Sequence, residues 1–227
     1  DAGQQEACRR KIRVSTGHLL SLVNDVLQVS KLESGRPTAV EEPFDLHDTL
    51  EECITILSPQ AEERGIRMSL EANSLQHNKL IGNALHLKQI LMNVIENALK
   101  YNRPKGKVFV QVQETACQGG TAKYRFVIED TGIGIGEEFK KHIFEPFTQE
   151  HQGARTHYNG AGLGMSIVKK LVDQMKGTIT LDSQLGKGST VQITLPIQID
   201  ETLSAQPMDT ALAEQYCGYA CSLGGGQ

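Results

Sequence analysis

The first residues that could do chemistry are two asparagines and a lysine in the stretch NVIENALKYN, residues 93–102. A helix turns by about 100° per residue, so Asn93, Asn97 and Lys100 share one polar stripe beside an apolar arc. Asparagine is mildly unfavourable inside helices. Its amide oxygen is a hard ligand suited to Mg²⁺, and a lysine one turn later could meet phosphate charge. Taken alone, an exposed polar face with incidental asparagines is the better explanation.

A second candidate group lies in the stretch EDTGIGI, residues 129–135, at the end of a predicted strand. Asp130 emerges there as a carboxylate that could accept a hydrogen bond from an exocyclic amine. Gly132 and Gly134 would let the backbone turn tightly and approach a flat ligand. By itself this run is weak evidence, because a plain turn is its commoner explanation.

A third candidate group is the stretch NGAGLGMSIVKKLV, in which Gly160, Gly162 and Gly164 lead directly into a predicted helix. The first N–H groups and the positive dipole end of a helix attract phosphate. A dinucleotide-binding fingerprint would need a strand just before the glycines. The polar and aromatic residues 148–160 come first instead, and they are typical of a mobile loop or lid.

Helices and strands in alternation must position these groups. We expect helices over residues 85–101 and 163–175, and another that Asp45 or Asp48 caps and that runs to Arg64. Periodicity and turn residues predict strands over residues 66–70, 107–113, 123–129, 178–182 and 190–196, with a possible short strand at residues 44–46. The last strands arrive as hairpins. The pattern predicts an α+β fold, a two-layer α/β sandwich with helices on one face of a mixed, mostly antiparallel sheet.

The ends of the chain differ from this central part. Residues 15–34 predict a long amphipathic helix, whose wide apolar stripe needs a partner helix, although packing on its own domain is the alternative. We therefore divide the chain into a helical segment (1–36), a linker (37–42), a globular domain (43–199) and a tail or linker (200–227).

Composition excludes several classes of protein. The chain has 227 residues, a net charge of −4 and 39% apolar residues, which is typical of a globular protein of one or two domains. We find no membrane segment and no signal peptide, and the acidic balance argues against nucleic acid as a partner. The five cysteines are expected to be reduced; Cys217 and Cys221 could pair or hold a metal, but incidental thiols are the simpler reading.

The order and spacing of the three groups resemble the motif series of the GHKL ATPases, and in detail the catalytic and ATP-binding domain of sensor histidine kinases. The similar stretches are ILMNVIENALKYN (N box), EDTGIGI (first glycine box), IFEPFTQ (F box) and GAGLGMSIVKKLV with its trailing hairpin (second glycine box). The stretch LLSLVNDVLQVSKLESG is similar to the second helix of the family's dimerisation hairpin. The resemblance covers residues 15–196 and implies a Bergerat-type ATP-binding fold preceded by a long helix.

The resemblance also implies roles for particular residues. Asn97 would bind the Mg²⁺ that bridges the ATP phosphates, with Asn93 beside it, and we assign catalytic roles to Asn93 and Lys100. Asp130 would recognise the adenine amine, which selects adenine over guanine. The remaining residues expected to line the nucleotide or its lid are Tyr101, Gly132, Gly134, Phe144, Phe147, Gly160, Gly162, Leu163, Gly164 and Thr190. Core packing would explain the two phenylalanines equally well.

Two departures from the family refine the prediction. ATP-hydrolysing relatives carry a glutamate at the position matching Asn93, which activates water, whereas an amide cannot act as a general base. None of the seven histidines has the context of the family's phosphoacceptor; His47 is followed by Asp48, but Glu52 stands where proline is expected. We therefore expect a fragment or truncated protein that begins after the acceptor helix.

The resemblance implies a two-component histidine kinase that transfers the γ-phosphoryl group of ATP to a histidine outside this chain. Its cofactors would be ATP and Mg²⁺. Its partners would be a response regulator or receiver domain and, in the full-length protein, a second copy. Its location would be cytoplasmic, either as a cytoplasmic protein or as the cytosolic part of a membrane-anchored sensor. Two alternatives stay open: a catalytically silent, ATP-responsive scaffold, and water-directed ATP hydrolysis, which Asn93 disfavours.

Overall fold

The computed structural model describes residues 5, 8, 9, 16, 41–149 and 162–202, with residues 73 and 74 described in their backbone alone. The expected helix over residues 15–34 (apart from residue 16), the linker up to residue 40 and the tail beyond residue 202 lie outside this part of the chain. Most of the predicted lid, with Gly160, also lies outside it. The described residues cover the expected globular domain, 43–199, except for residues 150–161.

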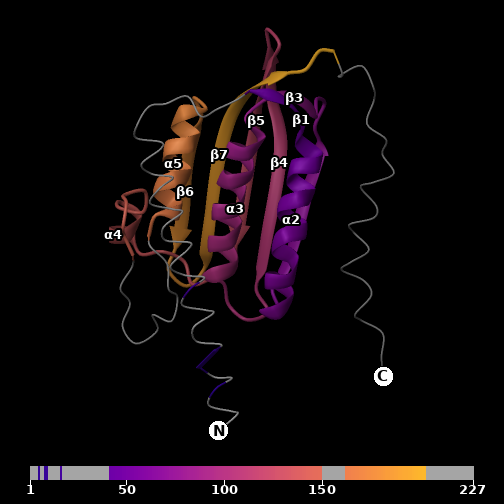
Figure 1. Cartoon of the computed structure of the whole chain (residues 1–227). Coiled ribbons are helices and arrows are strands. Elements are labelled where there is room, and N and C mark those ends of the chain that lie inside the picture. The colour runs from indigo at the N-terminus through magenta and orange to yellow at the C-terminus, as the bar shows by residue number, and fades with distance from the viewer. Residues whose placement is uncertain (1–4, 6–7, 10–15, 17–40, 150–161, 203–227) are drawn as a thin grey trace.

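One seven-stranded sheet forms one layer of the fold, and helices form the other (Figure 1). The strands are β1 (Glu42–Asp45), β2 (Arg67–Ser74), β3 (Lys79–Gly82), β4 (Lys107–Gln118), β5 (Thr121–Asp130), β6 (Thr178–Gln184) and β7 (Gly188–Ile199). Their order is β1-β3-β7-β5-β4-β2, and β6 also pairs with β7. Every pairing is antiparallel except that of β2 with β4. The expected mixed, mostly antiparallel sheet is confirmed.

The helices are α2 (Leu46–Glu63), α3 (Ala84–Lys100), α4 (Glu137–Lys140) and α5 (Gly164–Gln174), and Figure 1 shows α2, α3 and α5 side by side on one face of the sheet. Asp45 caps α2 by accepting hydrogen bonds from the N–H groups of His47 (2.7 Å) and Asp48 (3.3 Å). Of the two predicted caps, Asp45 is therefore the one used. Asn83 caps α3 in the same way, accepting from His86 N at 2.8 Å.

The core lies between the two layers. The apolar arc expected on α3 is buried, and so are alternate residues of β4, β5 and β7: Val108, Val110, Val112, Ala122, Tyr124, Phe126, Ile128, Val191, Ile193, Leu195, Ile197 and Ile199. This period of two turns every second side chain of the central strands towards the helices. The intervening residues, which include Lys107 and Glu129, face the other side of the sheet and are more exposed.

The structure adds two elements that the sequence pattern did not predict. Strand β3 has four residues between β1 and β7, and α4 is a single helical turn. Strands β4 and β5 also extend beyond their predicted bounds to a hairpin turn at Gly119 and Gly120, both of which have positive φ. Short elements carry too few residues for periodicity to reveal them.

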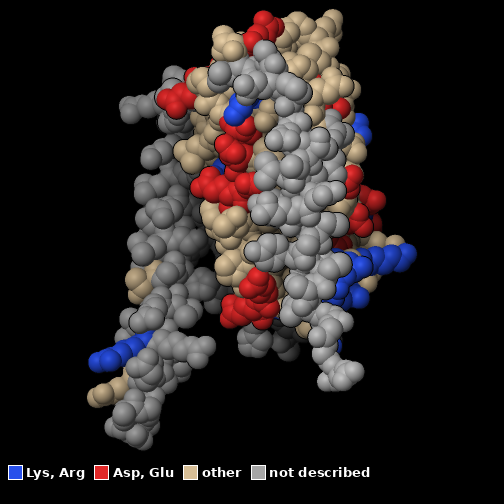
Figure 2. Space-filling view, turned by 90° about the vertical axis from the view of Figure 1, so that its right-hand side faces the viewer, with Lys and Arg blue, Asp and Glu red and all other residues tan. Residues whose placement is uncertain are grey.

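The described surface is acidic along α2. This helix contains five acidic residues and no lysine or arginine, and Figure 2, drawn from this side, shows more Asp and Glu than Lys and Arg. Within the described part of the chain, every helix falls short of the length or the hydropathy that a bilayer-spanning helix needs.

Candidate nucleotide-binding site

Asn93, on the polar stripe of α3, lies close to the beginning of α5. Asn93, Asn97 and Lys100 are all half-buried, as expected for residues beside the apolar arc. A Cβ atom added to Gly164 would lie 3.3 Å from Oδ1 of Asn93, so the two helices approach closely at this point. The absence of a side chain at Gly164 leaves space between the asparagine amide and the first turn of α5.

The first turn of α5 begins without a capping side chain. Leu163 precedes the helix, is 1% exposed and makes no side-chain capping bond. The leucine therefore anchors the helix in the core, while the first N–H groups of α5 receive no acceptor from their N-cap side chain. Ser166 donates its hydroxyl to the Leu163 carbonyl at 2.8 Å, which fixes the entry of the chain into the helix. Such a terminus favours phosphate.

The end of α3 also contacts the first glycine stretch. The Ile133 N–H donates to the Tyr101 carbonyl at 3.1 Å, and the Gly132 N–H donates to Asp130 Oδ1 at 2.7 Å. A Cβ atom on Gly132 would lie 2.5 Å from the Tyr101 carbonyl oxygen and 2.6 Å from Asp130 Oδ1. Only glycine permits this approach, so residue 132 determines how Asp130 is held against the end of α3.

Asp130 is a desolvated carboxylate. Its pKa is raised from the ordinary value of 3.8 to about 6. Burial is the largest cause and the charge of Glu129 adds to it, while backbone hydrogen bonds from Gly132 and Ser189 oppose the shift. A buried carboxylate is stabilised by a hydrogen-bond donor, because the donor replaces lost water. An exocyclic amine would supply that donor.

The loop after β5 is held against the turn between β6 and β7. Gly134 has φ of 68°, and a Cβ there would lie 2.0 Å from the Gln184 carbonyl oxygen. The Gly186 N–H donates to the Ile133 carbonyl at 2.7 Å, and the Ile135 N–H donates to Ser183 Oγ at 2.9 Å. The two glycines of the EDTGIGI stretch thus serve different contacts: Gly132 meets α3, and Gly134 meets the β6–β7 turn.

Phe144 and Phe147 differ in burial. Phe144 is half-buried, whereas Phe147 is 69% exposed and has φ of 62°, so core packing does not account for Phe147. Gly162 also has positive φ, and a Cβ on it would lie 2.7 Å from the Thr148 carbonyl oxygen. The backbone after Phe147 therefore lies against the glycine stretch that leads into α5.

Lys100 and Tyr101 lie together at the end of α3. The Lys100 ammonium lies 4.9 Å from the centre of the Tyr101 ring, and Tyr101 as a whole is 39% exposed. Arg64 donates to the carbonyl groups of Leu99 (3.0 Å) and Lys100 (3.1 Å), which satisfies the last turn of the helix. The Tyr101 carbonyl adjoins Gly132, so this lysine and aromatic residue belong to the end of α3 that meets the first glycine stretch.

Strand register separates Thr190 from Asp130. Ser189 pairs with Asp130, and Thr190 pairs with Glu129, so the side chains of Ser189 and Thr190 lie on opposite faces of the sheet. Ser189 shares the face of Asp130 and lies 2.9 Å, Oγ to Oγ, from the buried Ser183. The sequence analysis named Thr190 and missed Ser189; counting strand alternation from the glycine turn would have pointed to the serine.

A second missed residue is Asn102, which is 7% exposed. Its side chain donates to the Lys107 carbonyl at 2.9 Å and accepts from the Arg103 N–H at 2.9 Å and from the Thr131 hydroxyl at 3.3 Å. These bonds fasten the turn after α3 to the strand end that carries Asp130. An asparagine immediately after a helix is the only signal the sequence offered.

The residues of this site fit a magnesium–nucleotide complex. Asn93 and Asn97 supply hard amide oxygens, and Gly164 leaves room beside the first of them. Mg²⁺ is usually bound through few protein ligands, with waters and substrate phosphates completing the coordination. Helix α3 lies against both glycine stretches, through Asn93 at Gly164 and through Tyr101 at Gly132. The three candidate groups therefore lie around one helix.

Comparison with known proteins finds similarity to an ATPase family and to sensor histidine kinases. Residues 82–199 match the family described as histidine kinase-, DNA gyrase B-, and HSP90-like ATPase. The autoinducer 2 sensor kinase/phosphatase LuxQ of Vibrio parahaemolyticus is 37% identical over 202 residues, covering 88% of this chain and 23% of the relative. The signal transduction histidine-protein kinase BarA of Escherichia coli (strain K12) is 32% identical over 209 residues, covering 92% and 23%.

A solved structure shares the fold over most of the chain. Full-length ShkA, crystallised in complex with AMPPNP, matches with a TM-score of 0.72 and 32% identity, covering 86% of this chain and 39% of ShkA. The chain spans less than a quarter of the length of the two curated relatives.

Proposed function

The chain belongs to the family of histidine kinase-, DNA gyrase B-, and HSP90-like ATPases, and from this we propose that it is the ATP-binding catalytic part of a two-component sensor histidine kinase. The reaction breaks the bond between the γ-phosphorus of ATP and its bridging oxygen, and forms a phosphorus–nitrogen bond to a histidine of a dimerisation helix. ADP leaves. The observation that carries the proposal is the meeting of α3 with both glycine stretches beside Asp130.

Each part of the site has a proposed task. Asp130 accepts a hydrogen bond from the adenine amine, and Gly132 lets the backbone pass the base. The first N–H groups of α5, exposed by Gly162 and Gly164, receive the phosphates. Lys100 neutralises phosphate charge. Transfer of a phosphoryl group needs positioning and charge neutralisation more than covalent chemistry from the protein, which suits this set of groups.

Asn97, with Asn93 beside it, would hold the Mg²⁺ ion that neutralises the phosphates. The ion's binding can be tested without catalysis, by measuring ATP affinity calorimetrically with and without Mg²⁺. We expect Mg²⁺ to increase the affinity of the unaltered chain and to have little effect on Asn97→Ala. An equal gain in both proteins would remove Asn97 from the metal site.

Asn93 favours a kinase over a hydrolase. An amide cannot take a proton from water, so the site lacks the general base that water attack would need at this position. The expected acceptor is a histidine, with phosphate passing on to a response regulator or receiver domain, and a second copy completing a dimer. We also propose residues 43–199 as the catalytic domain, acting at a cytoplasmic location.

Transfer can be tested with ATP labelled at the γ-phosphate and a separately supplied dimerisation-helix peptide with the family's acceptor histidine. We expect acid-labile, base-stable label on the peptide, and much less label with Asp130→Asn at the same subsaturating ATP concentration. Nucleotide affinity is measured in parallel. ATP binding without label on the peptide would support the scaffold alternative, and rapid release of labelled phosphate without peptide would support hydrolysis.

A further inference from the structure

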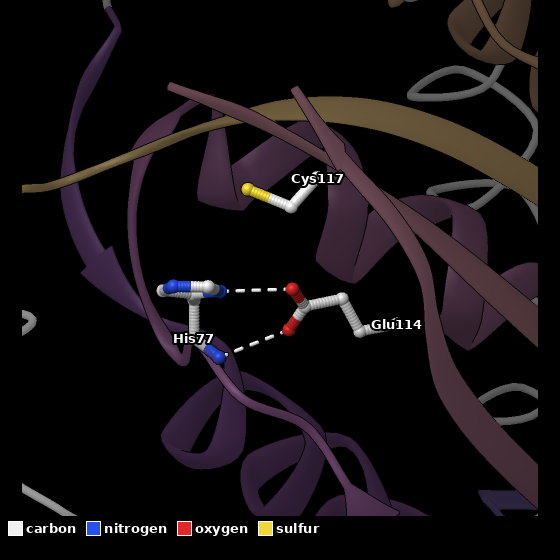
Figure 3. A group of neighbouring side chains, drawn as sticks. All are labelled: His77, Glu114 and Cys117. Atoms are coloured by element: carbon white, nitrogen blue, oxygen red, sulfur yellow. Dashed lines mark hydrogen bonds and ion pairs between the residues drawn. The ribbon is translucent and has the colours of Figure 1, made fainter. Parts of the chain in front are cut away.

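A cluster of three metal-ligating residue types lies at the other end of the sheet. His77, in the connection between β2 and β3, faces Glu114 and Cys117 of β4, and Figure 3 shows the three side chains turned towards one another. One ring nitrogen of His77, one carboxylate oxygen of Glu114 and the Cys117 sulfur all lie within 4.8 Å of each other. The proposed nucleotide site uses none of these residues.

A β-bulge creates this arrangement. Residues three apart on a regular strand point to opposite faces, so Glu114 and Cys117 should diverge. The register shifts between Glu114 and Ala116, so that Glu114 pairs with Tyr124 and Cys117 pairs with Ala122. Tyr124 and Ala122 both face the core, which places the carboxylate and the thiol on the same side of β4. A bulge commonly redirects a side chain in this way.

Glu114 and His77 are already held in place. The side chain of Glu114 is only 5% exposed, and its Oε2 accepts from the backbone N–H groups of Gln76 and His77, both at 2.9 Å. Its Oε1 lies 2.8 Å from His77 Nδ1. The Tyr124 hydroxyl donates to the His77 carbonyl at 2.8 Å. A hydrogen-bonded carboxylate–imidazole pair therefore stands beside Cys117, which is exposed and in no disulfide.

We propose that His77, Glu114 and Cys117 bind one Zn²⁺ ion, with water as the fourth ligand. A thiolate and an imidazole favour zinc over Mg²⁺ or Ca²⁺, which prefer oxygen ligands. Zinc bonds of about 2.0–2.3 Å at tetrahedral angles separate ligand atoms by roughly 3.3–3.7 Å. The 2.8 Å between His77 Nδ1 and Glu114 Oε1 must therefore widen by about 0.5 Å as the ion replaces their hydrogen bond, and the longest separation, at most 4.8 Å, must close by about 1 Å. Rotation of the exposed Cys117 side chain can supply that closure.

The ion would join the β2–β3 connection to the β4–β5 hairpin. Tyr124, beside the cluster, and Asp130, in the nucleotide site, lie about 20 Å apart along β5 at about 3.3 Å per residue. Zinc should therefore stabilise the fold without taking part in ATP binding. This separation allows the zinc site and the proposed function to be tested independently.

The test uses the full chain with Cys8, Cys217 and Cys221 changed to serine, which leaves Cys117 and the buried Cys53 as thiols. Zinc affinity is measured by competition with a chromophoric chelator. We expect one equivalent of Zn²⁺, and a loss of at least about 100-fold in affinity for Cys117→Ala, because removing a ligand should cost at least as much as removing a residue that supports one. Gln118→Ala, at the neighbouring exposed position, is the matched control and should bind normally.

Co²⁺ provides a second readout, because a cobalt–thiolate bond absorbs in the near ultraviolet and Cys117→Ala should lose this band. Zinc should raise the melting temperature of the serine-substituted chain and of Gln118→Ala, but not that of Cys117→Ala. Metal-free melting temperature and ATP affinity verify that each variant folds. Absence of stoichiometric zinc from the serine-substituted chain, or unchanged affinity in Cys117→Ala, would overturn the proposal.

Discussion

The two ends of β5 show different ways of building a polar site. At its last residue, Asp130 is positioned by close approach of the backbone. A Cβ atom added to Gly132 or Gly134 would lie only 2.0–2.6 Å from a neighbouring oxygen atom, so the loop can approach its neighbours only because these residues are glycines. At its other end, Tyr124 belongs to a network of side chains in which His77 and Glu114 bond to each other and to nearby backbone. The hairpin glycine there, Gly119, has nothing within 4 Å of an added Cβ.

The difference shows what each end can tolerate. A site made by close backbone approach leaves room for a large, flat ligand but permits no added side chain. A site made by side chains accepts changes in the surrounding backbone, but it loses its function when one group is removed. The same substitution, such as glycine to alanine, should therefore lower the free energy of unfolding by different amounts at the two ends of β5.

The largest contrast should come from alanine at two glycines with positive φ. Gly134→Ala combines a strained backbone with a clash against the Gln184 carbonyl, and we expect the free energy of unfolding to fall by more than about 3 kcal/mol. Gly119→Ala meets no neighbour and should cost only about 1–2 kcal/mol, the penalty for the left-handed conformation. Urea denaturation measures both. Equal costs would show that backbone crowding does not distinguish the two ends.

Asp130→Asn should produce the next largest effect. The amide cannot present the same charged acceptor to the adenine amine, and we expect ATP affinity to fall about 100-fold, the value of a charged hydrogen bond in a desolvated site. Calorimetry with Mg-ATP measures the change. The matched control is Glu129→Gln, which alters a neighbouring carboxylate on the opposite face and should leave affinity unchanged. Similar losses in both variants would contradict the assignment of Asp130.

The pH dependence of ATP binding should report the same carboxylate. Because burial raises the pKa of Asp130 to about 6, its accepting form is lost below that pH, and affinity should fall about tenfold per pH unit. ATP itself titrates in this range, so the profile of Asp130→Asn is subtracted. A difference profile that is flat from pH 5 to pH 7 would argue against this pKa.

The stability of the nucleotide-free chain should change in the opposite sense. The pKa of Asp130 is about 6 in the fold and 3.8 in an unfolded chain, so the unfolded state releases the proton first as pH rises. The carboxyl therefore contributes most to stability below pH 4, and this contribution is lost between pH 4 and 6. Comparing urea denaturation of the unaltered chain and Asp130→Asn across this range isolates the effect.

The smallest predicted effect distinguishes two neighbours on β7. Ser189→Ala removes a hydroxyl on the face of Asp130, and ATP affinity should fall roughly fivefold, as expected for one neutral hydrogen bond. Thr190→Val changes the opposite face and should have no measurable effect. Calorimetry measures the ATP affinity of both variants. A loss in Thr190→Val alone would restore the residue that the motif comparison indicated.

Much of the fold was predictable because its signals are local. The apolar arc of α3 repeats at helical spacing, and the strands of the sheet alternate, so burial of Ile90, Val94 and Phe126 follows from pattern alone. The cap at Asp45 was predicted as one of two possibilities, and only the observed hydrogen bonds distinguish it from Asp48. Strand β3 escaped prediction because it is stabilised by its neighbours β1 and β7 rather than by its own four residues.

The sequence by itself determined which residues could bind a nucleotide. Asn93, Asn97, Asp130 and the glycines carry the necessary chemical groups, and their order along the chain indicated the family. The tertiary structure decided how these groups meet: Gly132 against α3, Gly134 against the β6–β7 turn, and Ser189 rather than Thr190 on the face of Asp130. It also brought His77 to Glu114 and Cys117. Contacts between distant segments depend on strand register and on a bulge, and neither leaves a local pattern in the sequence.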